Sequence, residues 1–378
     1  MRKKRILIFL LFLHLLFLPV FLSLKGSQRV SFDGEKLPWP HQRPGMTQEE
    51  IKELAKNTWI YDNFGSYHGV EDLNFLYFHD GLDIMLHNGT KIYAIKSGHV
   101  KSARNDGCIN IGDTPGTSPG WGWEYAHVIN FQVEEGEYVL RGDYIADVTM
   151  NHIHLSRIHV PDGDWENKKN REYHHPNQYF TYDDTIPPEI IIPFYYFRNN
   201  SDEAFEDGSP PVVRGEVDIV VPMRDSSEAA LNGPIHYPWS IARIEYEILG
   251  EHTVQPVYVK SFDFTKMYFA DWPGRMYEQY TLAVYKPHYL PAIQERGWDG
   301  LYLFYNITNT DGSEELGKVE YSWDQYSWDT MALDEFGSRL FPDGRYTIKV
   351  TAYDFKGNSA TAMDTVEVRN IKKGIIRR

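Results

Sequence analysis

The sequence predicts an all-β protein with two folded domains, for three reasons. The chain has 378 residues, which is more than one hydrophobic core usually serves. It contains 26 Tyr and 10 Trp, and aromatic residues favour strands over helices. Residues 345–352 alternate between polar and apolar side chains, a pattern typical of a strand with one buried and one solvent-exposed face.

Residues 1–25 are predicted to be a signal peptide or an N-terminal membrane anchor. Residues 2–5 are basic and precede an almost unbroken apolar run at 6–24, as in targeting segments. Basic residues ahead of such a run stay in the cytoplasm, so we expect everything after residue 25 to be extracytoplasmic. Cleavage stays open because an A-x-A pattern is missing. Membrane contact is expected through this segment alone.

Charge and cysteine content exclude several kinds of site. The net charge is −15, which argues against a nucleic-acid partner because binding a polyanion requires clustered Lys and Arg. Cys108 is the only cysteine, so neither an intrachain disulfide nor a multi-thiolate metal site can form. Any metal ligands must therefore be histidines and carboxylates.

The remaining chain divides by composition. Residues 26–46 carry prolines among polar residues and are predicted to be a spacer. Thr47 and Glu50 form a capping-box pattern that predicts a helix at about 48–56. Short apolar runs between Gly and Asp turns predict strands in the first domain, 47–160. These strands are expected at 91–95, 99–103, 108–111, 123–129, 138–140 and 144–148.

The second domain is expected at 212–370, after a polar connector at 161–211 and before a basic tail at 371–378. The alternation in residues 345–352 needs two packed sheets, so a β-sandwich is predicted. Residues 343–354 resemble immunoglobulin-like modules of exported proteins. Such modules act as spacers or bind a protein or glycan partner.

Two short patterns can supply metal ligands. His79 and Asp83 are four residues apart with Gly81 between them, and this glycine permits a sharp turn that brings both side chains to one ion. His152 and His154 are two apart, so on a strand both imidazoles point to the same face. The alternative is an inert, exposed histidine pair. His127, taken alone, is more often the kind of histidine that has a structural role.

Together these patterns resemble the lysostaphin/LytM family of zinc endopeptidases. The resemblance is carried by residues 78–83 (an H-x-G-x-D motif), 89–100, 125–128, 139–145 and 152–154. It implies that His79, Asp83 and His154 bind Zn²⁺ and that His127 and His152 are the catalytic histidines. It also implies an antiparallel β-sheet or barrel-sandwich hybrid fold and a peptide substrate, usually the peptidoglycan cross-links of bacterial cell walls.

The resemblance has one departure and leaves three alternatives. Residues 147–151 are shorter than the family's loop and lack its glycines, which leaves substrate specificity open. An inactive family member acting as a binding scaffold at the cell envelope is one alternative, although such relatives usually lose ligands. A biotinyl-type carrier would need a lysine at the 149–151 turn, where none occurs. A surface adhesin would lack both zinc and hydrolysis.

Overall fold

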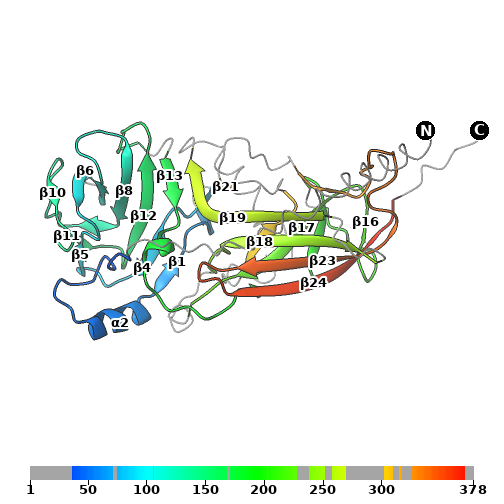
Figure 1. Cartoon of the computed structure of the whole chain (residues 1–378), viewed down its shortest axis with the longest axis horizontal. Coiled ribbons are helices and arrows are strands. Elements are labelled where there is room, and N and C mark those ends of the chain that lie inside the picture. Colours follow the sequence, from blue (N-terminus) through cyan, green and yellow to red (C-terminus); the bar gives the residue numbers. More distant parts are fainter. Residues whose placement is uncertain are drawn as a thin grey trace, which may run out of the picture. The chain divides into compact units, whose positions relative to one another are not determined.

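The computed structural model describes residues 36–70, 75–104, 106–167, 171–201, 203–227, 238–251, 258–269, 302–309, 315–316 and 326–370. Strands make up most of the elements in this part of the chain (Figure 1), and the predicted all-β class is confirmed. The predicted leader and basic tail lie outside the described residues. Within the described ranges, no helix is long and apolar enough to cross a membrane.

Helix α2 (Gln48–Asn57) begins at the predicted capping box. The Thr47 hydroxyl accepts a hydrogen bond from the Glu50 N–H, while the Glu50 carboxylate accepts one from the Thr47 N–H. These reciprocal bonds satisfy amide groups that the first helical turn leaves unpaired. Just before the helix, Trp39 is buried and stacks on Phe180, so this part of the predicted spacer packs against the β-structure.

The first set of strands runs from residue 60 to residue 160. They are β1 (Ile60–Asp62), β2 (Tyr67–Val70), β3 (Phe75–Phe78), β4 (Leu82–Met85), β5 (Lys91–Tyr93), β6 (Gly98–Arg104), β7 (Cys108–Gly112), β8 (Gly120–Ala126), β9 (Val128–Ile129), β10 (Tyr138–Val139), β11 (Tyr144–Val148) and β12 (His152–Val160). All the strands predicted in this range are present, with ends shifted by up to three residues.

The remaining elements follow residue 160. They are β13 (Arg171–His174), the 3₁₀ helix η2 (Pro176–Tyr179), β14 (Glu189–Ile190), β15 (Tyr195–Arg198), β16 (Val212–Val213), β17 (Glu216–Arg224), β18 (Arg243–Gly250), β19 (Tyr258–Phe269), β20 (Leu303–Asn306), β21 (Glu315–Leu316), β22 (Trp328–Asp329), β23 (Gly344–Tyr353) and β24 (Ser359–Val368). Residues 161–211, predicted as a connector, thus include β13, η2, β14 and β15.

Strand β12 is the centre of the first sheet. Its start pairs with β4, its length pairs with β8, and its later residues also pair with β13, all antiparallel. Ile153 and Leu155 are fully buried in a core that they share with Leu82 and Ile84 of β4. Because side chains alternate along a strand, this burial turns His152 and His154 to the opposite face of β12.

A second core lies between two sheets. One is the continuation of the first sheet through β19, β18, β23, β24 and β16, and the other is the separate sheet built around β17. Ile219 of β17, Ile244 of β18 and Ile348 of β23 are fully buried in this core. The predicted alternation in β23 is present in its burial pattern. The immunoglobulin-like assignment and the domain boundaries stay predictions.

Hydrogen bonding continues from the first sheet into the later strands. β13 pairs with β12 on one side and with β19 on the other (Figure 1). A buried ion pair stabilises this junction, because Arg171 Nη1 of β13 donates to Glu124 Oε2 of β8 at 2.8 Å. The strand that carries His152 and His154 is therefore part of one hydrogen-bonded sheet that extends beyond residue 160.

Candidate metal centre

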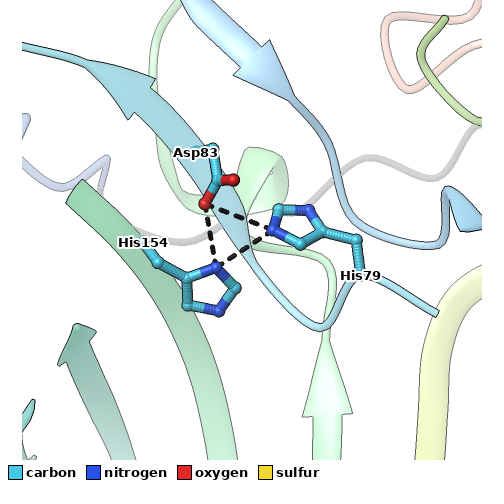
Figure 2. A group of neighbouring side chains, drawn as sticks. All are labelled: His79, Asp83 and His154. Carbon is cyan, nitrogen blue, oxygen red and sulfur yellow. Dashed lines mark hydrogen bonds and ion pairs between the residues drawn. The ribbon is translucent and has the colours of Figure 1, made fainter. Parts of the chain in front are cut away.

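The pairing of β4 with β12 brings two of the predicted ligands together. His154 lies directly opposite Asp83 in this antiparallel pair, and side chains at opposed positions on one face are close neighbours. His79 lies in the turn that leads into β4. Figure 2 shows His79, Asp83 and His154 converging on a common point.

The three donor atoms lie at separations suited to a small cation. His79 Nε2 is 3.0 Å from His154 Nδ1 and 3.2 Å from Asp83 Oδ1, and His154 Nδ1 is 2.9 Å from Asp83 Oδ1. A tetrahedral zinc with bonds of about 2.1 Å would separate its ligand atoms by roughly 3.4 Å. A shift of a few tenths of an ångström in each side chain would meet that spacing, so the residues present fit Zn²⁺.

Second hydrogen bonds fix the orientation of both imidazoles. His79 Nδ1 donates to the Asn63 carbonyl oxygen at 3.0 Å. His154 Nε2 lies 3.0 Å from Asp80 Oδ1 and 2.9 Å from Ser156 Oγ. In each ring, these contacts assign the proton to the nitrogen that faces away from the other ligands. The remaining lone pairs then point at the common centre, as second-shell partners of metal-binding histidines require.

Asn63 is itself held by a residue far along the chain. The Ser240 N–H donates to Asn63 Oδ1 at 2.7 Å, and Trp239 Nε1 donates to the Ile60 carbonyl oxygen at 3.2 Å. Both contacts join the segment that supports His79 to the residues just before β18. The orientation of one ligand therefore depends on hydrogen bonds across more than 170 residues of sequence.

The electrostatics of the trio favour a bound cation. Burial opposes charge on His79, but the carboxylates of Asp83 and Asp62 outweigh it and raise the pKa of His79. For His154, burial is again outweighed, here by hydrogen bonds to Asp80 and Asp83, and its pKa rises to about 10. Burial would raise the pKa of Asp83, yet the neighbouring imidazoles hold it well below its usual range. The buried carboxylates therefore favour positive charge at this point, either from protons on the imidazoles or from a metal cation.

His127 and His152 lie beside the trio. The His152 Nδ1–H donates to the Met150 carbonyl oxygen at 2.9 Å, and its Nε2 lies 3.8 Å from Asp83 Oδ2. His127 follows β8 directly, and its ring centroid lies 4.4 Å from that of His152. Burial, followed by the adjacent His154 and His152, lowers the pKa of His127 to about 4. The structure brings all the predicted site residues together, while their individual roles stay predictions.

Gly81 has a steric role that the sequence did not reveal. A Cβ atom at this position would lie 2.6 Å from His154 Nε2 and 2.7 Å from the Leu155 carbonyl oxygen. Its φ is not in the positive range, so space beside His154, rather than a left-handed turn, requires glycine. Any side chain here would displace a predicted ligand.

Sequence reasoning missed the residues that orient the ligands, namely Asn63, Asp80, Ser156 and Ser240. Two of them carried a usable signal. Asp80 adjoins His79 in sequence, and Ser156 continues the same strand face as His152 and His154. Asn63 and Ser240 approach the site only through tertiary packing, which no local pattern shows.

Residues 77–169 match the model of peptidase family M23. The matched segment contains His79, Asp83, His127, His152 and His154, and it supports an M23 peptidase. Comparison with curated protein sequences gave no match. The M23 segment thus contains the three residues of the candidate metal centre.

Solved structures similar to this chain include a domain of an antimicrobial peptidase, LytU and a pore-forming complex. The catalytic domain of the antimicrobial peptidase lysostaphin from Staphylococcus simulans is 20% identical, covering 33% of this chain and 94% of that domain, with a TM-score of 0.26. LytU is 22% identical, with 32% and 83% covered and a TM-score of 0.24. A chain of the SpoIIQ–SpoIIIAH pore-forming complex is 16% identical, with 39% and 91% covered and a TM-score of 0.27. These identities are below 25% and the TM-scores below 0.5, so they do not indicate the function of this chain.

Proposed function

We propose that this protein is an exported zinc-dependent endopeptidase that hydrolyses peptide bonds in peptidoglycan cross-links. One observation carries the proposal: His79, Asp83 and His154 place their donor atoms within 4.8 Å of one another, inside the segment that matches an M23 peptidase. Three protein ligands leave a fourth position open, as catalytic zinc sites require.

The chain's own residues supply binding and proton transfer. His79, Asp83 and His154 would hold the ion, and Zn²⁺, when bound, lowers the pKa of a water to about 7 and polarises a carbonyl group. His152 commits its Nδ1–H to the Met150 carbonyl oxygen, so its Nε2 is the atom available to exchange a proton with the substrate. The adjacent His127 ring is placed to share that exchange or to donate a hydrogen bond to the developing oxyanion.

Export and the substrate class are part of the proposal. The basic and apolar pattern of residues 1–25 supports translocation, which would give the site access to the cell wall. Peptide cross-links are proposed because the motifs at residues 78–83, 125–128 and 152–154 resemble the lysostaphin/LytM family, whose usual substrates are these cross-links. The C-terminal strands would then bind a protein or glycan partner at the cell wall.

The proposal is tested by measuring zinc content and hydrolysis on the purified full-length chain with peptidoglycan peptides as substrate. We expect stoichiometric zinc, cleavage of a peptide bond, loss of activity after chelation, and recovery when Zn²⁺ is added back. Stoichiometric zinc without cleavage of wall peptides or of protein substrates would instead favour the inactive scaffold. Absence of zinc from the folded protein would contradict the metal assignment.

Asp80 provides a test of how the site is held together. Replacing Asp80 by asparagine removes the carboxylate beside His154 Nε2. The His154 ring should then be less firmly oriented and less basic. We expect zinc affinity to fall about 10- to 100-fold, as for other second-shell substitutions, measured by competition with a chromogenic chelator. Asp106→Asn, an exposed aspartate paired with Arg104, is the matched control. Equal zinc affinity in Asp80→Asn and the control would refute this role.

A further inference from the structure

Three aspartates from separate parts of the chain form a second buried carboxylate cluster. Asp184 follows η2, Asp225 directly follows β17, and Asp354 directly follows β23. One carboxylate oxygen from each lies within 4.8 Å of the other two. Their exposed fractions are 8%, 4% and 5%. Like charges at this separation in a buried site repel strongly unless something neutralises them.

Asp225 has an unsatisfied oxygen within this cluster. Its Oδ1 is buried and has no hydrogen-bond partner among the residues that the structure describes. The backbone N–H and C=O of Asp225 both bond to Trp239, at 3.0 and 3.2 Å, so the residue is anchored where it stands. A buried, unpaired carboxylate oxygen is costly, and a bound cation would offset that cost.

The other two aspartates are joined by hydrogen bonds. Asp354 Oδ1 accepts bonds from the N–H groups of Lys356 and Asn358, both at 2.8 Å. The Asn358 side chain donates to Asp354 Oδ2 at 2.7 Å and to the Asp184 carbonyl oxygen at 3.2 Å. These bonds fix the turn after β23 against the segment after η2. The Asp354 carboxylate is thereby held in place, and the Ile186 N–H holds the Asp184 carboxylate by donating to its Oδ1 at 3.2 Å.

The nearby lysine does not neutralise the cluster by direct pairing. Lys356 places its Nζ 3.9 Å from the centroid of the Tyr182 ring. Within the described part of the chain, it makes no ion pair with the three aspartates at 4.0 Å or less. Burial lowers the pKa of Lys356, whereas burial together with Asp184 and Asp354 raises the pKa of Asp225 well above its usual range.

We propose that Asp184, Asp225 and Asp354 bind a calcium ion. The cluster offers oxygen donors only, which suits a hard cation, and three carboxylates can supply as many as six of the 6–8 oxygens that Ca²⁺ takes. Mg²⁺ is a poorer fit because it demands strict octahedral geometry and keeps its waters. The bound ion would join segments separated by 41 residues (225 − 184) and 129 residues (354 − 225) of sequence. Its role would be to stabilise the fold around β17 and β23.

Terbium luminescence offers a direct binding test, because Tb³⁺ replaces Ca²⁺ in oxygen sites and is excited through nearby aromatic rings. Burial and then the charges of the three aspartates raise the pKa of Tyr182 well above its usual range. The Tyr182 ring lies 6.4 Å from that of Trp239, and Trp239 is bonded to the backbone of Asp225, so both rings can act as sensitisers. With the full-length chain, we expect sensitised emission that Ca²⁺ displaces and that equal Mg²⁺ displaces less. Displacement by Mg²⁺ at lower concentration than Ca²⁺ would overturn the calcium assignment.

Thermal unfolding measures the stabilising role. Ca²⁺ at about 100 times its Kd should raise the Tm of the full-length chain by roughly 3–5 °C. Asp225→Asn should lose both this shift and the Tb³⁺ signal, while Asp207→Asn, an exposed aspartate with the same charge change, should keep both. His79→Ala should also keep them, which separates this site from the proposed zinc centre. A wild-type Tm insensitive to Ca²⁺, or an equal shift in Asp225→Asn, would refute the proposal.

Discussion

Replacing His154 by alanine is expected to abolish both zinc binding and hydrolysis. The substitution removes Nδ1, which lies 3.0 Å from His79 Nε2 and 2.9 Å from Asp83 Oδ1. Catalytic zinc sites use three protein ligands, and the two that remain would bind the ion too weakly. Loss of the ion removes several kcal/mol of transition-state stabilisation. At about 1.4 kcal/mol per tenfold, kcat/KM should fall on the order of 10³-fold or more, measured together with bound zinc.

A histidine outside the site supplies the control. His87 is exposed, two residues after β4 ends, and His87→Ala should keep wild-type zinc content and turnover. Circular dichroism on both variants checks that the sheet is intact, since His154 lies in the middle of the first sheet. Stoichiometric zinc in a folded His154→Ala protein would contradict the assigned ligand set.

The His152→Ala variant should keep its zinc but lose turnover. In the wild-type chain, His152 Nε2 lies 3.8 Å from Asp83 Oδ2, while His152 Nδ1 donates to the Met150 carbonyl oxygen. His152 is therefore close to the three proposed ligands without being one of them. General acid or base groups typically contribute 10²- to 10⁴-fold. We expect kcat to fall by about that factor while zinc affinity changes little, as measured by steady-state kinetics and metal analysis on the same preparation.

Comparison with His127→Ala tests how the two histidines divide the work. If both act in one proton-transfer step, the double variant should lose little more than the single variants, because residues that act as a unit are non-additive. Retained turnover in His152→Ala would remove this residue from the mechanism. Loss of zinc from it would move it into the ligand set.

The residues of the candidate metal centre could be identified from the sequence because they follow local rules. His152 and His154 obey the two-residue period of a strand, and burial of Ile153 and Leu155 follows from the same alternation. His79 and Asp83 lie in one short segment made of a turn and the start of a strand, so their closeness in sequence also places them close together in the folded chain. Pairing of these two segments, with Asp83 opposite His154, was accessible only through the family resemblance, since register between distant strands has no local sequence signal.

The parts that could not be predicted depend on non-local packing. Asp225 and Asp354 follow ordinary strands, and nothing near either residue in the sequence indicates that they meet Asp184. The strand pairs between β13 and β19 likewise join segments that seemed to belong to different units. Strand existence is a local property, whereas the neighbours of each strand are decided by the whole fold.

The hydrogen bond from Ser240 to Asn63 affects whether the M23 segment could keep its site when it is transferred to another protein. Asn63 positions His79 through its carbonyl oxygen, yet both Asn63 and Ser240 lie outside the matched residues 77–169. A fragment cut to those limits would also expose the edge of β12 where β13 pairs with it, and open strand edges favour aggregation. Grafting this catalytic unit onto another protein would therefore require carrying residues from both flanks.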